Sequence, residues 1–238
     1  MLNKNCILEK CISAALLLSL GVFSTFPASA IRTFKDIENK LTWIEVSTAT
    51  VDSENDHSLM VLQSPISENY GRSYHFGHGS WETEDGYSLW NFWDKCKAPL
   101  LQRACMPVFG DVEFPSTDLF SPTTTEGKHC GDDNPLFILS YHDAIAYLSL
   151  KYEVVNPDDP YALTFTDNQN PWAAQCFKQL RLKGEHVWLR ETWCIDREYG
   201  LELCPDGAAK RASTIDSQRN AIIPACWINN ENIKWSHV

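Results

Sequence analysis

Three side chains that lie close together in the sequence have the chemistry of metal ligands. His75, His78 and Glu82 supply imidazole and carboxylate donors, and Gly77 and Gly79 would let the backbone bend around an ion. The same glycines oppose the helix that would bring all three side chains to one face. The segment therefore predicts either the centre of a metal-dependent hydrolase or a surface loop whose histidines contact a ligand.

A second group of side chains offers oxygen donors. Asp158, Asp159, Asp167 and Asn168 lie in one short segment, and Ca²⁺ prefers carboxylate and amide oxygens. No EF-hand spacing is present, and Asp and Asn beside proline also form turns and helix caps. These oxygen donors suggest a calcium site as a hypothesis, with turn and cap chemistry as the alternative.

Carboxylates beside tryptophan suggest a third chemistry. Glu82 and Glu84 follow Trp81 closely, and Trp90 comes soon after. Glycosidases use two carboxylates roughly 5 to 10 Å apart, whereas solvated acidic loops carry the same residues without catalysis. Flat indole rings give a large contact area at low entropic cost, so Trp81 and Trp90 are candidates for binding a glycan or a protein.

The N-terminus has the pattern of an export signal. Lys4 and Lys10 form a basic start, Ala14–Phe26 is apolar, and Pro27–Ala30 supplies the small residues that signal peptidase recognises. The apolar run is shorter than the roughly twenty residues that span a bilayer. We therefore predict a signal peptide of residues 1–30 and no membrane insertion.

The mature part, residues 31–238, has the length of one domain. The whole chain carries a formal net charge of −11, and an acidic surface repels phosphate backbones and anionic membranes. Nucleic acid is therefore an unexpected partner. A secreted or periplasmic location follows from the signal peptide.

Export also places the cysteines in an oxidising compartment. Seven cysteines follow the predicted cleavage site, enough for three disulfides and one remaining thiol. We expect Cys194 and Cys204 to face each other across a hairpin and Cys96 and Cys105 to close a short loop. The remaining thiol is expected to be structural rather than a nucleophile.

The N-terminal elements are mainly strands. Within Leu41–Phe76, an alternating segment at residues 42–46 and an apolar run at Ser58–Gln63 predict two strands joined by a turn at Ser53–Asp56. Gly86–Cys96 then predicts a short helix with its apolar residues on one face.

Two helices with clear start signals follow. Ser140 and Asp143 form a capping box, and the apolar pattern predicts a helix as far as Asn156. The dipeptide Asn170-Pro171 predicts the start of a second helix, which Gly184 ends.

The C-terminal part returns to strands. His186–Cys194 and Leu201–Cys204 predict a hairpin, and Ala221–Asn229 predicts a further strand. The expected fold class is α+β, with two helices against irregular antiparallel sheets and with disulfides that stabilise them.

One segment carries a family resemblance. Asp133–Tyr147, and above all its S-Y-x-D-A-x-A-Y core, resembles the segment that opens the first long helix of the formylglycine-generating-enzyme (sulfatase-modifying factor) family. Tyr161–Asp167, Trp172–Ala174 and Gly184–Trp188 resemble later segments of that family. The resemblance covers about residues 133–188.

The resemblance implies a C-type-lectin-like fold, whose members include oxidases, other secreted enzymes and proteins that only bind. The family's R-G-G-S-W and terminal G-F-R segments are missing, and the region that carries oxidase chemistry in the family is replaced here by Ile222–Asn230. No catalytic residue is therefore transferred from the family to this chain.

We expect an exported, non-catalytic domain that recognises a glycan or a protein at the cell envelope or outside the cell, a host target included. The alternative is a secreted enzyme, either a metal-dependent or carboxylate hydrolase or a diverged formylglycine-generating-type oxidase. Histidine and carboxylate side chains that converge in a pocket would favour the enzyme, whereas a shallow surface with exposed tryptophan would favour the binding domain.

Overall fold

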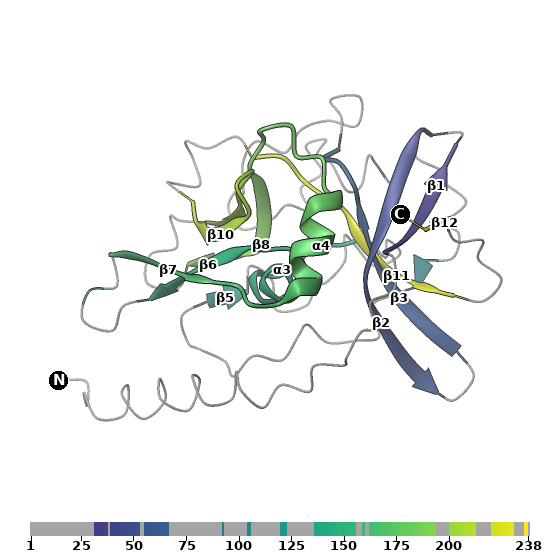
Figure 1. Ribbon diagram of the computed structural model, residues 1–238, viewed down its shortest axis with the longest axis horizontal. Helices are drawn as coiled ribbons and strands as arrows, with labels where there is room; N and C mark the ends of the chain where they lie inside the picture. The colour runs from purple at the N-terminus through teal and green to yellow at the C-terminus, as the bar shows by residue number, and fades with distance from the viewer. Residues whose placement is uncertain are drawn as a thin grey trace.

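The computed structural model describes residues 31–37, 39–52, 55–66, 92, 104–105, 120–122, 136–155, 159, 162–193, 200–212, 220–230 and 236–237. This part of the chain forms two six-stranded sheets and two helices, with α4 between the two sheets in Figure 1. The predicted α+β class is confirmed. No helix in the described residues is long and apolar enough to cross a membrane.

The first sheet is antiparallel throughout and contains the hairpin that the alternation predicts. Its strands, in spatial order, are β12 (Ser236–His237), β1 (Arg32–Asp36), β2 (Leu41–Asp52), β3 (Asn55–Leu62), β11 (Ala225–Asn229) and β4 (Ala104–Cys105). The hairpin consists of β2 and β3. The strand predicted at Ala221–Asn229 is present as β11, but it begins only at Ala225.

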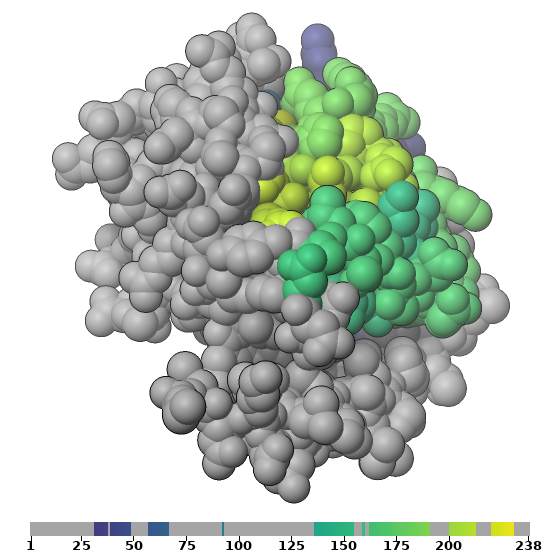
Figure 2. Space-filling view, turned by 90° about the vertical axis from the view of Figure 1, so that its left-hand side faces the viewer, coloured from purple at the N-terminus to yellow at the C-terminus, as the bar shows by residue number. Residues whose placement is uncertain are grey.

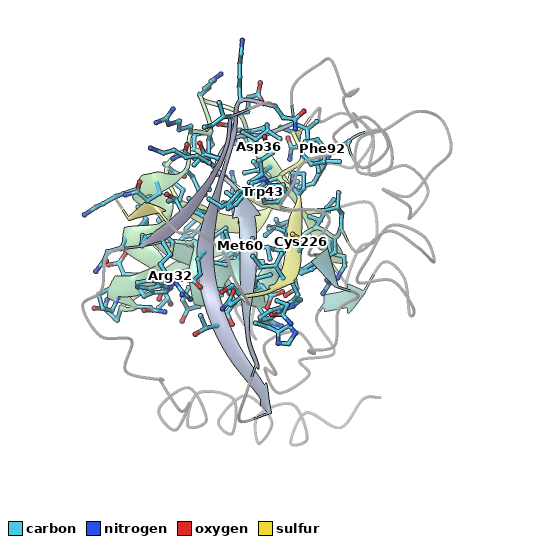
Figure 3. The ribbon with its side chains drawn as sticks, turned by 90° about the vertical axis from the view of Figure 1, so that its right-hand side faces the viewer. Arg32, Asp36, Trp43, Met60, Phe92 and Cys226 are labelled. Carbon is cyan, nitrogen blue, oxygen red and sulfur yellow. The ribbon has the colours of Figure 1, made fainter. Side chains whose placement is uncertain are left out.

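The centre of the first sheet is buried. Trp43, Met60 and Cys226, on β2, β3 and β11, are fully buried, and Met60 pairs with Cys226 across the strands (Figure 3). The ring of Phe92 lies 6.1 Å from that of Trp43. Phe92 is the one described residue of the predicted helix Gly86–Cys96, and its conformation is helical.

The second sheet is mixed. Its spatial order is β5 (Phe120–Pro122), β8 (Val187–Trp193), β9 (Gly200–Leu203), β10 (Ala208–Arg211), β6 (Lys151–Val155) and β7 (Leu163–Asp167). The β10–β6 pair is parallel, and the other pairs are antiparallel. Helix α3 (Tyr141–Tyr147) contacts β8, β9 and β10 and so covers one face of this sheet.

The start of α3 is as predicted, but its length is not. The Ser140 side chain accepts a hydrogen bond from the Asp143 backbone N–H, and the Asp143 carboxylate accepts one from the Ser140 N–H. The helix ends at Tyr147, and Tyr152 lies in β6 instead of on the helical stripe. β6 pairs with both β7 and β10, and these pairings provide hydrogen-bond partners for its backbone. They outweigh the helical pattern of this short segment.

Helix α4 (Pro171–Gln179) begins at the predicted cap, where the Asn170 side chain accepts a hydrogen bond from the Trp172 N–H. It ends before Gly184, which has a φ of +82° in the turn that leads to β8. The Trp172 indole N–H donates to the Val46 carbonyl at 2.8 Å. This contact ties α4, which packs against α3, to the first sheet.

Candidate metal centre

The register of the β8–β9 hairpin brings three potential metal ligands to one face of the second sheet. Val187 pairs with Leu203, so the preceding His186 and the following Cys204 lie opposite each other. Glu202 lies two residues before Cys204, and side chains two apart on a strand point to the same face. His186, Glu202 and Cys204 therefore face the same way.

A tight turn then adds a lysine to the same face. In the turn Cys204-Pro205-Asp206-Gly207, proline fixes φ, the Asp206 carboxylate accepts a hydrogen bond from the Ala208 N–H, and Gly207 has a φ of +83°. The Cys204 N–H donates to the Ala208 carbonyl. The chain reverses into β10, where Lys210 pairs with Glu202 on the neighbouring strand.

One carboxylate oxygen, Glu202 Oε1, lies at the centre of the group. Cys204 Sγ donates to it at 3.5 Å, His186 Nδ1 lies 3.1 Å from it, and Lys210 Nζ lies 3.6 Å from it. The other oxygen, Oε2, accepts a 2.7 Å hydrogen bond from Asn220 Nδ2. One ligand atom from each of His186, Glu202 and Cys204 lies within 4.8 Å of the other two.

The group is buried on one side and open on the other. Glu202 is 1% exposed and Cys204 4% exposed, whereas the His186 side chain is 38% exposed. The Nδ1 atom of His186 is itself buried and makes no hydrogen bond, although it lies 3.1 Å from Glu202 Oε1. A buried imidazole nitrogen thus lies beside a carboxylate and a thiol.

A pocket of about 450 Å³ opens above these side chains. In Figure 2, the yellow-green surface of the β9–β10 segment lies between green surfaces formed by residues that precede it in the sequence. The residues that line the pocket are Lys151, Phe165, His186, Cys204, Pro205, Asp206, Ala208 and Lys210.

The electrostatics of the site keep the thiol protonated. Burial, and then the charge of Glu202, raise the pKa of Cys204 to about 12, although Lys210 opposes this. At the rim, Lys151 Nζ lies 2.9 Å from an Asp206 oxygen. That contact lowers the pKa of Asp206 and raises the pKa of Lys151.

This arrangement suits a metal ion better than nucleophilic catalysis. A nucleophilic cysteine needs a thiolate and a nearby base, whereas the Cys204 proton is directed at Glu202 and the pKa is high. Tetrahedral zinc places its sulfur, nitrogen and oxygen donors about 3.4–3.6 Å apart. The separations of 3.1 and 3.5 Å from Glu202 Oε1 approach these values, and the His186 and Cys204 ligand atoms lie within 4.8 Å of each other.

Most of the residues that the sequence suggested as a site lie outside the described part of the chain. This group contains the histidines and the glutamate of the zinc candidate, the two tryptophans of the binding candidate, one calcium candidate and two cysteines of the expected disulfides. They are His75, His78, Glu82, Trp81, Trp90, Asp158, Cys96 and Cys194, and the zinc and tryptophan predictions remain predictions. Cys105 lies in β4, paired with Trp227 of β11, and its predicted bridge to Cys96 also remains a prediction.

The described members of the calcium candidate differ in exposure and in their contacts. The Asn168 side chain makes hydrogen bonds within the fold: its amide nitrogen donates to the Ser149 carbonyl, and its oxygen accepts from the Asn170 N–H. Asp159 and Asp167 are exposed. The turn and cap chemistry that the sequence offered as the alternative therefore accounts for Asn168.

The disulfide expected between Cys194 and Cys204 needs a correction. Strands β8 and β9 do form the predicted hairpin, but Cys204 carries a buried, free thiol. Leu203 pairs with Val187, the first residue of β8. Cys204 therefore lies opposite His186, just before β8 begins, whereas Cys194 follows the last residue of that strand in the sequence.

Sequence reasoning missed His186, Glu202, Lys210 and Asn220. The available signal was the E-x-C-P-D-G pattern of residues 202–207, which puts two ligand types on one strand face immediately before a turn. Comparison of this chain with protein-family models, with curated proteins and with solved structures finds no match.

Proposed function

We propose that this protein binds a transition-metal ion, zinc by its donor set, at His186, Glu202 and Cys204. The observation that carries the proposal is the convergence of an imidazole nitrogen, a thiol and a carboxylate around Glu202 Oε1. Three protein ligands beside an open pocket are the pattern of zinc sites that keep one coordination position for water or a ligand. The ion would release the Cys204 proton and bind the thiolate.

The neighbours of the three ligands support this assignment. Asn220 holds Glu202 Oε2, and such hydrogen bonds orient the carboxylates that bind metals. The alternative is that Lys210 alone balances the buried carboxylate, since its ammonium lies 3.6 Å from Oε1. The Lys210 side chain is 31% exposed and lines the pocket, so its ammonium can move away from Oε1 within the pocket when an ion binds that oxygen.

Zinc titration of the full chain tests the proposal. The protein is stripped with a chelator under reducing conditions and titrated with zinc in competition with a chromophoric chelator. We expect one zinc per chain, with affinity lowered at least about 100-fold in His186→Gln and in Cys204→Ser. Cys176→Ser is the matched control, because Cys176 is another buried, free thiol on a different element.

The proposal is wrong if the stripped wild-type chain takes up no zinc, or if His186→Gln binds it as tightly as the wild type does. The His186 variant decides the matter even if Cys204→Ser fails to fold, because the imidazole is partly exposed. Circular dichroism of each variant verifies the fold.

We also propose that the protein is exported and that its fold is C-type-lectin-like and contains disulfides, as the sequence predicts. Cleavage after Ala30 would leave Ile31 at the N-terminus, immediately before β1 begins at Arg32. N-terminal sequencing of the secreted protein tests the cleavage site, and peptide mapping without reduction tests the disulfides. A metal-bound domain outside the cytoplasm is compatible with recognition of a glycan or a protein there.

A further inference from the structure

We infer that the loaded metal site takes a small carboxylate ligand, with Lys210 as the residue that selects the negative charge. This inference rests on the proposed function, because the ligand would share the open coordination position of the ion. It is carried by the pocket that two of the metal ligands, His186 and Cys204, help to line, and by the charged side chains around it.

The charges around the pocket change when an ion binds. Without metal, the ammonium groups of Lys151 and Lys210 balance the carboxylates of Asp206 and Glu202. A divalent ion adds positive charge beside the Lys210 ammonium, which lies 3.6 Å from Glu202 Oε1. The loaded pocket is therefore more positive than the metal-free pocket, and it favours an anionic ligand over a neutral one.

Lys210 is the cation that becomes available. Its present contact is with Glu202 Oε1, the oxygen that the three metal ligands share. When the ion binds that oxygen, the ion replaces the lysine as the carrier of compensating charge. The ammonium then lies beside the metal, where it can donate to one oxygen of a carboxylate while the other oxygen binds the ion.

Lys151 is less available because Asp206 holds it. The two groups form a 2.9 Å ion pair at the rim, and the Lys151 ammonium also lies 5.5 Å from the centre of the Phe165 ring. Phe165 is 44% exposed and lines the same pocket. The rim thus offers an aromatic face to the apolar part of a ligand, and the floor offers the charge.

The size of the pocket agrees with a small organic acid. Its volume of about 450 Å³ lies at the lower end of the range that small-molecule sites occupy, roughly 300–1,000 Å³. A ligand with one carboxylate and one ring would place the carboxylate at the metal and the ring against Phe165. Benzoate has this composition, and benzamide is its neutral counterpart of the same shape.

Cobalt-loaded protein provides the test. Co²⁺ accepts the same nitrogen, oxygen and sulfur donors as zinc, and its visible absorption changes when a ligand enters its coordination shell. The full chain is loaded with Co²⁺ and titrated with benzoate and with benzamide. We expect benzoate, and not benzamide, to shift the spectrum, and Lys210→Gln to weaken benzoate binding at least about tenfold.

Lys35→Gln is the matched control, because Lys35 is an exposed lysine on β1 of the other sheet. It should leave both cobalt and benzoate binding unchanged. Lys210→Gln should still bind cobalt, since it removes a competitor for Glu202. The inference is overturned if cobalt binds but benzoate leaves the spectrum unchanged, or if Lys210→Gln responds to benzoate as the wild type does. Failure of the wild-type chain to bind cobalt overturns the proposed function itself, and the inference with it.

Discussion

Asn220 Nδ2 donates a 2.7 Å hydrogen bond to Glu202 Oε2, and this contact leaves only Oε1 to face His186 and Cys204. Asn220 reaches this place because the following residue, Ala221, forms a parallel bridge with Val187 at the start of β8. A residue sixteen or more positions away from each ligand in the sequence thus determines how the carboxylate presents itself to an ion.

The first prediction concerns this hydrogen bond. Asn220→Ala leaves a buried carboxylate oxygen without its donor, which should lower the free energy of unfolding by about 1–3 kcal/mol. It should also weaken zinc binding about 10- to 100-fold, because Glu202 is no longer held in one orientation. Chemical unfolding and competitive zinc titration measure the two effects.

Asn230→Ala is the control for Asn220→Ala. Both amide atoms of Asn230 are buried and lack a hydrogen-bond partner in the described structure, so truncating this side chain removes no such contact. We expect zinc affinity to stay at the wild-type value. Equal losses of zinc affinity in the two variants would show that the Asn220 hydrogen bond has no special part in the site.

The second prediction compares two glycines with the same backbone conformation. Gly207 has a φ of +83° and Gly184 a φ of +82°. A Cβ atom at Gly207 would lie 2.6 Å from Leu150 Cγ, whereas a Cβ atom at Gly184 would meet nothing within 4 Å. Gly184→Ala should therefore cost about 1–2 kcal/mol for the left-handed conformation alone. Gly207→Ala should cost about 1–3 kcal/mol more, because Leu150 is crowded.

Urea unfolding of the two alanine variants measures this difference. A second substitution, Leu150→Ala, makes room beside residue 207. In the double variant, Gly207→Ala should therefore lower the free energy of unfolding by less than it does in the wild-type background. Equal destabilisation by the two glycine substitutions would mean that the contact with Leu150 contributes nothing.

Local signals in the sequence predicted the starts of the helices, because the hydrogen bonds of an N-terminal cap join residues at most three positions apart. Ser140 and Asn170 both occupy the expected positions. The end of α3 depends instead on strands that are distant in the sequence. Tyr152 follows a helical pattern, yet it pairs with β7 and, through Ala209, with β10. Neither partner strand is visible in the local sequence pattern.

The candidate site was missed for a related reason. Alternation predicted the β8–β9 hairpin but not its register, and a change of register alters which residues face each other. The predicted pairing placed Cys204 opposite Cys194, whereas the observed pairing of Leu203 with Val187 places it opposite His186. The ligands of a site that spans strands can be recognised only once that register is known.

The third prediction tests the capping box of α3. Ser140 is 1% exposed, and its hydroxyl accepts from the Asp143 N–H at 2.9 Å. Ser140→Ala should lower the free energy of unfolding by about 1 kcal/mol, and Ser140→Gly by less, because glycine is tolerated at this position. Urea unfolding of both variants provides the comparison. A residue inside a helix would give the opposite order, with glycine the more damaging substitution, and that order would contradict the assignment.

The last prediction concerns the pH dependence of stability at Glu153, a buried carboxylate on β6. Burial raises its pKa, while a 2.8 Å hydrogen bond from the Arg211 N–H and the Arg211 guanidinium act in the opposite direction. The folded state therefore binds the proton more tightly than the unfolded state does. The contribution of Glu153 to stability is complete below the pKa of the unfolded chain and is lost as pH rises through the pKa of the folded state.

Glu153→Gln isolates this contribution, because its amide oxygen can still accept from the Arg211 N–H while the charge is removed. We expect the stability of the variant relative to the wild type to increase as pH rises from 4 toward 7, and urea unfolding of both proteins at several pH values measures the difference. The comparison cancels the titration of all other groups that the substitution leaves unchanged. A difference that stays constant with pH, or that favours the wild type increasingly toward neutral pH, would show that the Arg211 contacts outweigh burial. Glu153 would then stabilise the fold as a charged group.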